Sequence, residues 1–270
     1  MSSRDGTRLA VRRSGSGAPL VLVHGSSGGL DSFDPITPLV RNRRWWGYAR
    51  RGYAPSGGCA HPKVFADDVA DLRAVIEAVG EPVDVLGASY GAIVALHCAR
   101  DDDAHRTALR SLVLFEPPLF AAGPDLEGVL ARYRTHLERS SLGAAARLFA
   151  AEVAQVPRPL LDALMGADDA DVTAPGDADE GDRAAAVGCL HDLEAMTADS
   201  GDLDRWAAVT APTLLLQGSD TWAPMPATMD ALAERLPRVR RAVLTGQTHF
   251  ATHTAPEAFA EAVNDFLAAA

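Results

Sequence analysis

The sequence predicts an α/β protein with a mostly parallel sheet, helices on both faces of that sheet, and a helical insert. Strand-like and helical patterns alternate up to residue 116, and they alternate again from residue 207 to residue 270. Between these parts, residues 117–206 contain helical patterns and no convincing strand. We therefore expect residues 1–116 and 207–270 to form one core. Residues 117–206 should form a helical lid, with an acidic loop near residues 166–182.

Short runs of apolar residues mark the strands of this sheet. Residues 19–23 are continuously apolar, which is typical of a strand that is buried on both faces. Residues 7–11 fit an edge strand, and a Gly-Ser-Gly turn follows it. The other predicted strands cover residues 45–48, 82–86, 111–115, 213–217 and 242–244.

Helices are predicted where apolar residues recur at a spacing of three or four. Residues 65–79 show this spacing most clearly, and Gly80 supplies the expected stop. The last helix, residues 256–267, begins with a proline in its first turn. Two more helices are expected at residues 91–100 and 229–236.

The composition of the chain disfavours some classes of binding partner. The formal net charge of −11 disfavours nucleic acid, and no apolar run approaches the roughly 20 residues that cross a bilayer. The polar N-terminus lacks the apolar core of a signal peptide, and the three cysteines form no metal-binding pattern. We expect a cytoplasmic monomer or homodimer that acts on a small molecule and binds neither nucleic acid nor a membrane. Its arginine pairs, including Arg50-Arg51, should lie on solvated edges.

Residues 87–91 (Gly-Ala-Ser-Tyr-Gly) form a G-x-S-x-G motif between a predicted strand and a predicted helix. A sharp strand-to-helix turn strains the backbone of the central serine, Ser89, and lifts its hydroxyl clear of the sheet. The helix N-terminus beneath it favours developing negative charge. The motif therefore predicts that Ser89 is a catalytic nucleophile, whereas the simpler interpretation is a helix N-cap.

A glycine-rich loop, residues 24–29 (His-Gly-Ser-Ser-Gly-Gly), follows the first buried strand. Acyl transfer needs two backbone N–H groups directed at the developing oxyanion. We expect them to come from Tyr90, directly after the nucleophile, and from Ser26 in this loop. His24 is expected to hold the loop by hydrogen bonds. A phosphate-binding loop is the competing interpretation, but no Gly-Lys-Ser/Thr follows.

The predicted general base is His249, which follows the last predicted strand. From there its side chain can reach over the carboxyl edge of the sheet toward Ser89, accept the serine proton and return it to the leaving group. His253 is close in sequence and is the second candidate.

Two carboxylates compete for the role of the acid that orients His249. Asp220 follows the strand at residues 213–217 and gives the chain order Ser, Asp, His. Glu116 follows the strand at residues 111–115. Both strand ends should lie on the same edge of the sheet. We favour Asp220 and keep Glu116 as the competing candidate.

Together these segments resemble the α/β-hydrolase superfamily over essentially the whole chain, and in particular the small actinobacterial-type α/β fold hydrolases. The resemblance implies an eight-stranded, mostly parallel sheet with a helical lid and esterase-like or lactonase-like chemistry. The matching segments are residues 24–29, 50–52 (Arg-Arg-Gly), 87–91, 116–118 (Glu-Pro-Pro) and 246–249 (Gly-Gln-Thr-His).

Some positions depart from the common form of the family. Ala49 stands where an Asp usually precedes the Arg-Arg-Gly turn, and the segment that contains Asp220 is one residue shorter than the common form. The similar haloalkane dehalogenases can place their acid after the earlier strand, which favours Glu116. Their nucleophile is Asp, as in the epoxide hydrolases, so Ser89 argues against both of those activities.

The predicted function is that of a serine hydrolase that needs no metal and no organic cofactor. It would cleave an ester, thioester or lactone of a small-to-medium apolar substrate through an acyl-enzyme on Ser89. Trp222 and Ser27 are candidate substrate contacts. Two alternatives stay open. The same site could serve an acyltransferase, cyclase, perhydrolase or C–C bond hydrolase, or the fold could carry a ligand-binding protein.

Overall fold

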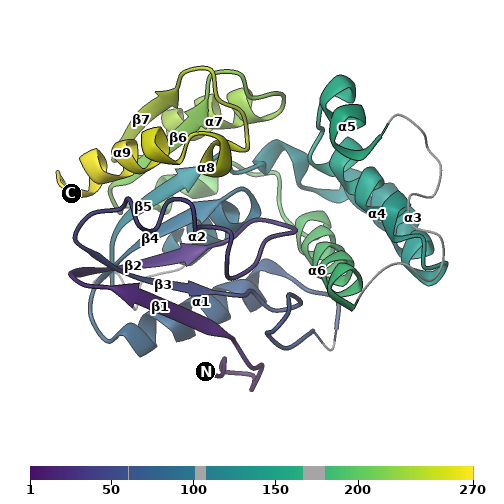
Figure 1. Ribbon diagram of the computed structural model, residues 1–270, viewed down its shortest axis with the longest axis horizontal. Helices are drawn as coiled ribbons and strands as arrows, with labels where there is room; N and C mark the ends of the chain where they lie inside the picture. The colour runs from purple at the N-terminus through teal and green to yellow at the C-terminus, as the bar shows by residue number, and fades with distance from the viewer. Residues whose placement is uncertain (60, 101–107, 167–179, 270) are drawn as a thin grey trace.

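The computed structural model describes residues 1–59, 61–100, 108–166 and 180–269, and its centre is one twisted sheet (Figure 1). The strands run in the order β1-β3-β2-β4-β5-β6-β7, and each neighbouring pair is parallel except β1 with β3. This confirms the predicted mostly parallel α/β sheet, with seven strands in the described residues rather than eight. The strands are β1 (Val11–Gly15), β2 (Ala18–Val23), β3 (Arg43–Tyr48), β4 (Val83–Ala88), β5 (Leu109–Phe115), β6 (Thr213–Gly218) and β7 (Val239–Leu244).

The first strand lies later in the chain than predicted. It begins at Val11, and Arg8 forms only an isolated antiparallel bridge with Ser2. The backbone near Arg8 is occupied by another loop, since the Ser56 hydroxyl accepts from the N–H of Ala10 and the Gly57 N–H donates to the Arg8 carbonyl. These contacts displace the edge strand toward the C-terminus.

Helices of the core flank the sheet. The sequence pattern predicted both ends of α1 and of α9 correctly. Helix α1 is followed by Gly80, whose φ of 77° suits a left-handed C-cap. The helix predicted at 229–236 begins four residues earlier. The core helices are α1 (Phe65–Val79), α2 (Tyr90–Arg100), α7 (Met225–Arg235), α8 (Ala251–Thr254) and α9 (Pro256–Leu267).

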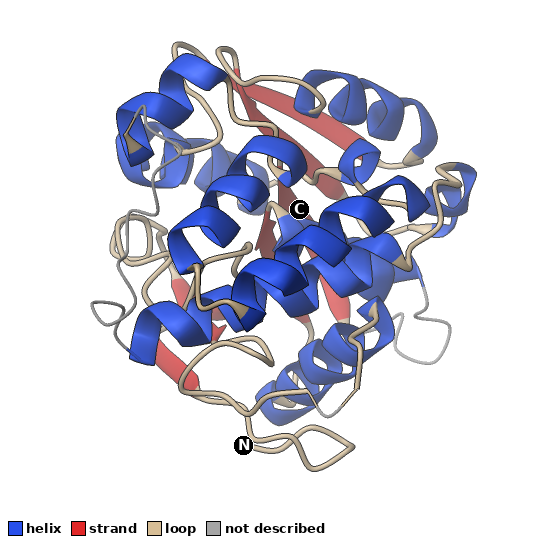
Figure 2. Ribbon diagram, turned by 90° about the vertical axis from the view of Figure 1, so that its right-hand side faces the viewer, coloured by secondary structure: helices blue, strands red, loops and turns tan. Residues whose placement is uncertain are grey.

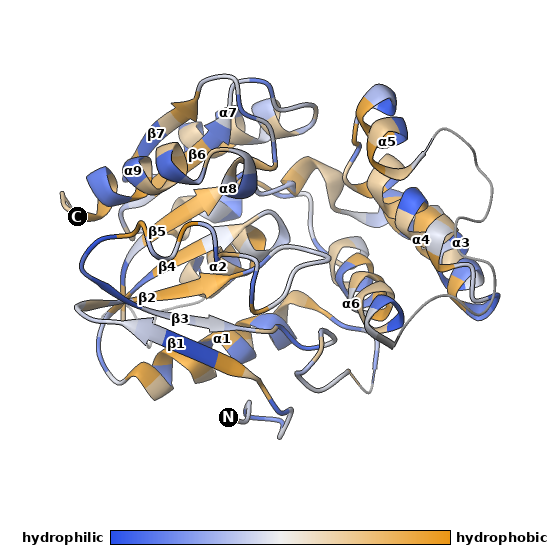
Figure 3. Cartoon of the chain, viewed as in Figure 1, coloured by the Kyte–Doolittle hydropathy of each residue, from blue (hydrophilic) through white to orange (hydrophobic). Residues whose placement is uncertain are grey.

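Both faces of the central strands are buried, which explains their continuous apolar sequences. In β2, Val21 and Val23 pack into the cluster that includes α1 and α2. Leu20 and Leu22 alternate to the opposite cluster, which includes α9. Figure 3 shows β2, β4 and β5 as strongly hydrophobic, whereas the edge strand β1 is partly hydrophilic.

Every described element between β5 and β6 is helical. These helices gather at one end of the sheet (Figure 1), and Figure 2 looks onto that end. The predicted acidic loop falls mostly on residues 167–179, outside the described residues. The elements of the insert are 3₁₀ turns η1 (Leu119–Ala121), η2 (Pro124–Leu126) and η4 (Asp204–Ala208), the π-helix η3 (Phe149–Val153), and helices α3 (Glu127–Glu138), α4 (Leu142–Leu148), α5 (Arg158–Met165) and α6 (Glu180–Thr197).

Within the described ranges, none of the helices combines the length and the apolar character that crossing a bilayer requires.

Candidate active site

Ser89 is the single residue between the end of β4 at Ala88 and the start of α2 at Tyr90. Its φ of 54° lies in the left-handed region, which a residue with a Cβ adopts only under strain. The Ser89 N–H donates to the Phe115 carbonyl at 2.8 Å, and its carbonyl accepts from the N–H of Ala92 at 2.9 Å. Neighbouring strand and helix therefore hold the strained turn that the G-x-S-x-G motif predicts.

Two glycines bring the glycine-rich loop against this turn. A Cβ added to Gly91 would lie 2.1 Å from the Val23 carbonyl oxygen, so only glycine permits α2 to approach the end of β2 so closely. A Cβ on Gly25 would lie 3.0 Å from the Ser89 Cβ. Residues 24–29 are thus in direct contact with the predicted nucleophile.

His249 is oriented by Glu116. The His249 Nδ1 lies 2.6 Å from Glu116 Oε2, and the glutamate side chain is fully buried. Glu116 also accepts hydrogen bonds from the Gly218 N–H at 2.8 Å and from the Thr221 hydroxyl at 2.9 Å. With Nδ1–H donating to the carboxylate, Nε2 is the ring nitrogen that can accept a proton. Ser89 and His249 line the same cavity.

Asp220, the favoured acid, does not contact His249. It is exposed, its carboxylate accepts from the Ser219 hydroxyl at 2.7 Å, and its N–H donates to the Gln247 carbonyl. The sheet order explains the difference, because β5 lies directly beside the nucleophile strand β4 whereas β6 is one strand further away. The geometry pairs Glu116 with His249, the predicted base. His253, the second candidate base, contacts Thr252 instead.

The two predicted oxyanion donors line the cavity together with Ser89. Tyr90 is the first residue of α2, and the first N–H groups of a helix have no partner within it. In the part of the chain that the structure describes, the Ser26 N–H makes no hydrogen bond, whereas the next amide, that of Ser27, donates to the Tyr53 hydroxyl at 3.2 Å. The Ser26 amide is therefore available to a bound oxyanion.

The cavity has a volume of about 230 Å³, and apolar side chains make up most of its wall. The insert and the core contribute about equally, with Phe149, Val153 and Leu161 from the insert and Met225 from α7 among the lining residues. Trp222 lines the cavity as well, and its Nε1–H donates to the Ala154 carbonyl at 2.9 Å. Ser27 is also part of the wall.

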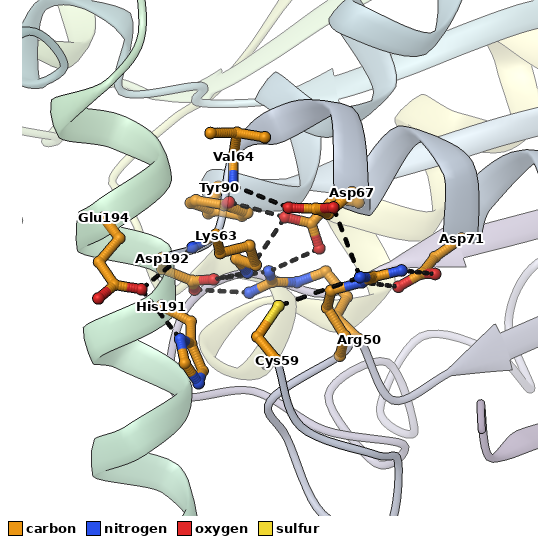
Figure 4. A network of polar contacts seen from close by, with 12 residues as sticks. Arg50, Cys59, Lys63, Val64, Asp67, Asp71, Tyr90, His191, Asp192 and Glu194 are labelled. Carbon is orange, nitrogen blue, oxygen red and sulfur yellow. Dashed lines mark hydrogen bonds and ion pairs between the residues drawn. The ribbon is translucent and has the colours of Figure 1, made fainter. Parts of the chain in front are cut away.

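Behind the loop lies a cluster of buried charges that the sequence analysis missed (Figure 4). Arg50 and Arg51, expected on a solvated edge, are 0% and 1% exposed. Arg51 pairs with Asp71. Arg50, the chain's single lysine Lys63, Asp68 of α1 and Asp192 of α6 are all fully buried, and we call these four the buried charge quartet.

The four charges of the quartet compensate one another, as buried ions must. Lys63 Nζ lies 2.6 Å from Asp192 and 3.1 Å from Asp68, while Arg50 binds both oxygens of Asp192 at 2.7 and 2.8 Å. Burial alone raises the pKa of Asp192, but Arg50 and Lys63 outweigh it and hold that pKa far below its ordinary value. In the sequence, the Arg-Arg-Gly turn is the only sign of this buried cluster. Asp192, the main partner of Arg50, lies 142 residues away, so no local pattern links the two.

His24 holds the loop, as its position predicts. Its Nε2 accepts from the Arg50 N–H at 3.0 Å, and its Nδ1 lies 2.7 Å from the Gly25 carbonyl. Burial, followed by the nearby Arg50 charge, lowers the pKa of His24 from 6.5 to about 3. The ring is therefore neutral at physiological pH, with its proton on Nδ1.

Among the described residues, no group of three or more His, Cys, Asp or Glu side chains is arranged to hold a metal ion.

His24 should make the stability of the protein depend on pH. Its pKa is lower in the folded protein, so its contribution is present above pH 6.5 and is lost as the pH falls toward 3. At about 1.4 kcal/mol per pKa unit, this loss amounts to roughly 5 kcal/mol. Urea denaturation between pH 7 and pH 4 should show a shallower pH dependence for His24→Gln than for wild type. His61→Gln, at an exposed histidine, is the control. Equal slopes for His24→Gln and wild type would refute this account.

Lys63→Met should strongly destabilise the fold. It leaves two buried carboxylates facing one arginine, and removing one partner of a buried ion pair costs about 3–5 kcal/mol. The measurement is the free energy of unfolding in urea. Arg4→Met, which removes one partner of the exposed pair Arg4–Glu77, is the control and should change stability by about 0.5 kcal/mol at most. A loss for Lys63→Met as small as that of the control would show that the quartet is not a compensated set.

The fold agrees with comparisons to known proteins. A family model described as the alpha/beta hydrolase family matches residues 20–262. An alpha/beta hydrolase from Sphaerobacter thermophilus is 29% identical, with a TM-score of 0.83 over 99% of both chains. The enol-lactonase of Burkholderia xenovorans (20% identity, TM-score 0.71, 98% of both chains) shares the fold. So does an esterase from Exiguobacterium antarcticum (19% identity, TM-score 0.74, 99% of this chain and 98% of that one). The chain belongs to the alpha/beta hydrolase family.

Proposed function

We propose that the protein is a serine hydrolase that forms an acyl-enzyme on Ser89. In the first step His249 Nε2 takes the Ser89 proton while the hydroxyl oxygen attacks a carbonyl carbon. The N–H groups of Ser26 and Tyr90 stabilise the resulting oxyanion, and the protonated His249 gives its proton to the leaving alcohol or thiol. In the second step His249 takes a proton from water as the water oxygen attacks the acyl carbon, and it returns that proton to the Ser89 oxygen as the acyl bond breaks and the acid leaves.

One observation carries this proposal. A serine in a strained strand-to-helix turn shares a cavity with a histidine whose other ring nitrogen is bound by a buried carboxylate at 2.6 Å. Glu116 fixes the ring orientation and stabilises the imidazolium that forms after proton transfer. Glu116 itself has a φ of 44°, so a strained residue of the proposed site directly follows each of the two neighbouring strands β4 and β5.

The residues that line the cavity favour an uncharged, apolar substrate of small to medium size. Of the described residues that line it, none is Asp, Glu, Lys or Arg. A substrate carboxylate or ammonium would therefore lose its water without gaining a partner there. An ester, thioester or lactone with an aliphatic acyl part fits this wall. The helical insert would act as the lid, because Phe149, Val153 and Leu161 form one side of the cavity.

Ser89→Ala should abolish turnover. The substitution removes the nucleophile and leaves cavity and oxyanion donors in place, so kcat on p-nitrophenyl butyrate should fall by about 10⁴-fold or more. A fluorophosphonate probe should label the wild type and fail to label the variant, as judged by mass spectrometry. Turnover that persists in the folded variant would disprove the assignment of Ser89.

The variants Glu116→Gln and Asp220→Asn should differ widely in kcat. Glu116→Gln keeps the shape of the side chain but removes the charge that orients His249, so kcat should fall by about 10³–10⁴-fold. Asp220→Asn changes an exposed carboxylate whose one hydrogen-bond partner within the described ranges is the Ser219 hydroxyl, so kcat should stay within about twofold of wild type. Steady-state kinetics on the same ester measures both. A loss in Asp220→Asn equal to that in Glu116→Gln would contradict the pairing seen here.

A further inference from the structure

The side chains of the two proposed oxyanion residues are both anchored in the buried charge quartet. The Ser26 hydroxyl donates to Asp192 Oδ2 at 2.7 Å. The Tyr90 hydroxyl donates to Asp68 Oδ2, also at 2.7 Å. Both residues line the cavity, and each donates its hydroxyl to one of the two carboxylates of the quartet.

The two cations join these carboxylates into one unit. Lys63 Nζ contacts both Asp68 and Asp192, at 3.1 and 2.6 Å. Arg50 binds Asp192 through two nitrogens and lies 3.5 Å from Asp68. The Arg50 guanidinium also sits 4.2 Å from the centre of the Tyr90 ring, in a cation–π arrangement. A displacement of either hydroxyl anchor would therefore be resisted by the whole quartet.

Arg50 fixes the backbone that leads to Ser26 as well. Its Nε donates to the His24 carbonyl at 2.9 Å and its Nη2 to the Gly25 carbonyl at 3.1 Å. The loop contains three glycines, which by themselves would leave its amides free to reorient. Contacts from the quartet to the peptide groups before Ser26 and to its hydroxyl remove that freedom.

We propose that the buried charge quartet positions the oxyanion hole, setting the separation and direction of the Ser26 and Tyr90 N–H groups through the two side-chain hydroxyls. Oxyanion donors act only when they are held about 2.7–3.1 Å from the charge that develops. Asp192 belongs to α6, so this geometry also depends on how the insert is seated on the core. The inference rests on the proposed function, in which these two amides are the donors.

The experiment removes each hydroxyl and keeps each amide. Ser26→Ala deletes the bond to Asp192, and Tyr90→Phe deletes the bond to Asp68. Two matched controls remove hydroxyls that make no hydrogen bond to the quartet. Ser111→Ala loses a buried hydrogen bond to Asp84 on the neighbouring strand β4, and Tyr48→Phe loses a buried hydroxyl that has no partner among the described residues.

For each variant we would measure kcat and KM on p-nitrophenyl butyrate. We would also measure the inhibition constant of a propyl trifluoromethyl ketone, whose serine adduct carries an oxyanion.

Misdirected donors weaken binding of the oxyanion more than binding of the neutral ester. In Ser26→Ala and Tyr90→Phe we therefore expect kcat to fall by about 10- to 100-fold with KM within about threefold of wild type. The inhibition constant of the ketone should rise in proportion. Both controls should retain wild-type kcat and wild-type inhibition.

Two results would overturn the inference: kcat within twofold of wild type in both hydroxyl variants, or a loss of kcat with no change in ketone affinity. The second result would indicate general structural damage. Failure of the proposed function is distinguishable, since it appears as continued turnover by Ser89→Ala, whereas failure of the positioning role leaves Ser89→Ala inactive.

Discussion

Four charged side chains that are fully removed from water impose the strictest requirement on this structure. Two carboxylates and two cations without exposure must lie within contact distance of one another, or each would carry an uncompensated cost of several kcal/mol. They come from the turn after β3, the segment before α1, α1 itself and α6 of the insert. Their mutual contacts therefore fix the insert on the core at the back of the glycine-rich loop. The loop, in turn, rests against Ser89.

The backbone at the carboxyl edge of the sheet is strained at two positions. Ser89 and Glu116 follow adjacent strands, and both have positive φ values, 54° and 44°. Such conformations persist only where the surroundings determine them, and they occur preferentially at functional sites. Here the surroundings are specific: the Ser89 amide donates to Phe115, and Glu116 is held by Gly218 and Thr221. The strained backbone thus places the proposed nucleophile and the proposed acid directly after neighbouring strands.

Local sequence patterns predicted the features that depend on interactions between residues close together in the chain. The apolar spacing of α1 and its glycine stop gave both ends of that helix, and the alternation of strands and helices gave the sheet class. The choice between Asp220 and Glu116 could not be made this way, because both follow strands that end on one edge and only the lateral strand order decides which is nearer to Ser89. Arg50 was misinterpreted for the same reason. Its partner Asp192 lies on another element 142 residues away, and nothing in the Arg-Arg-Gly turn reveals a buried partner.

The neutrality of the buried charge quartet has a consequence for the proposed chemistry. Arg50 and Lys63 lie behind the two oxyanion amides, but each is bound to the carboxylates of Asp68 and Asp192, and the four formal charges cancel. The two cations therefore provide little net field at the carbonyl, and stabilisation of the oxyanion must come from the N–H groups and the N-terminus of α2. Stabilisation by N–H groups depends on direction far more than stabilisation by a point charge does. A site built in this way needs rigid support for its amides, and the quartet is placed where that support is required.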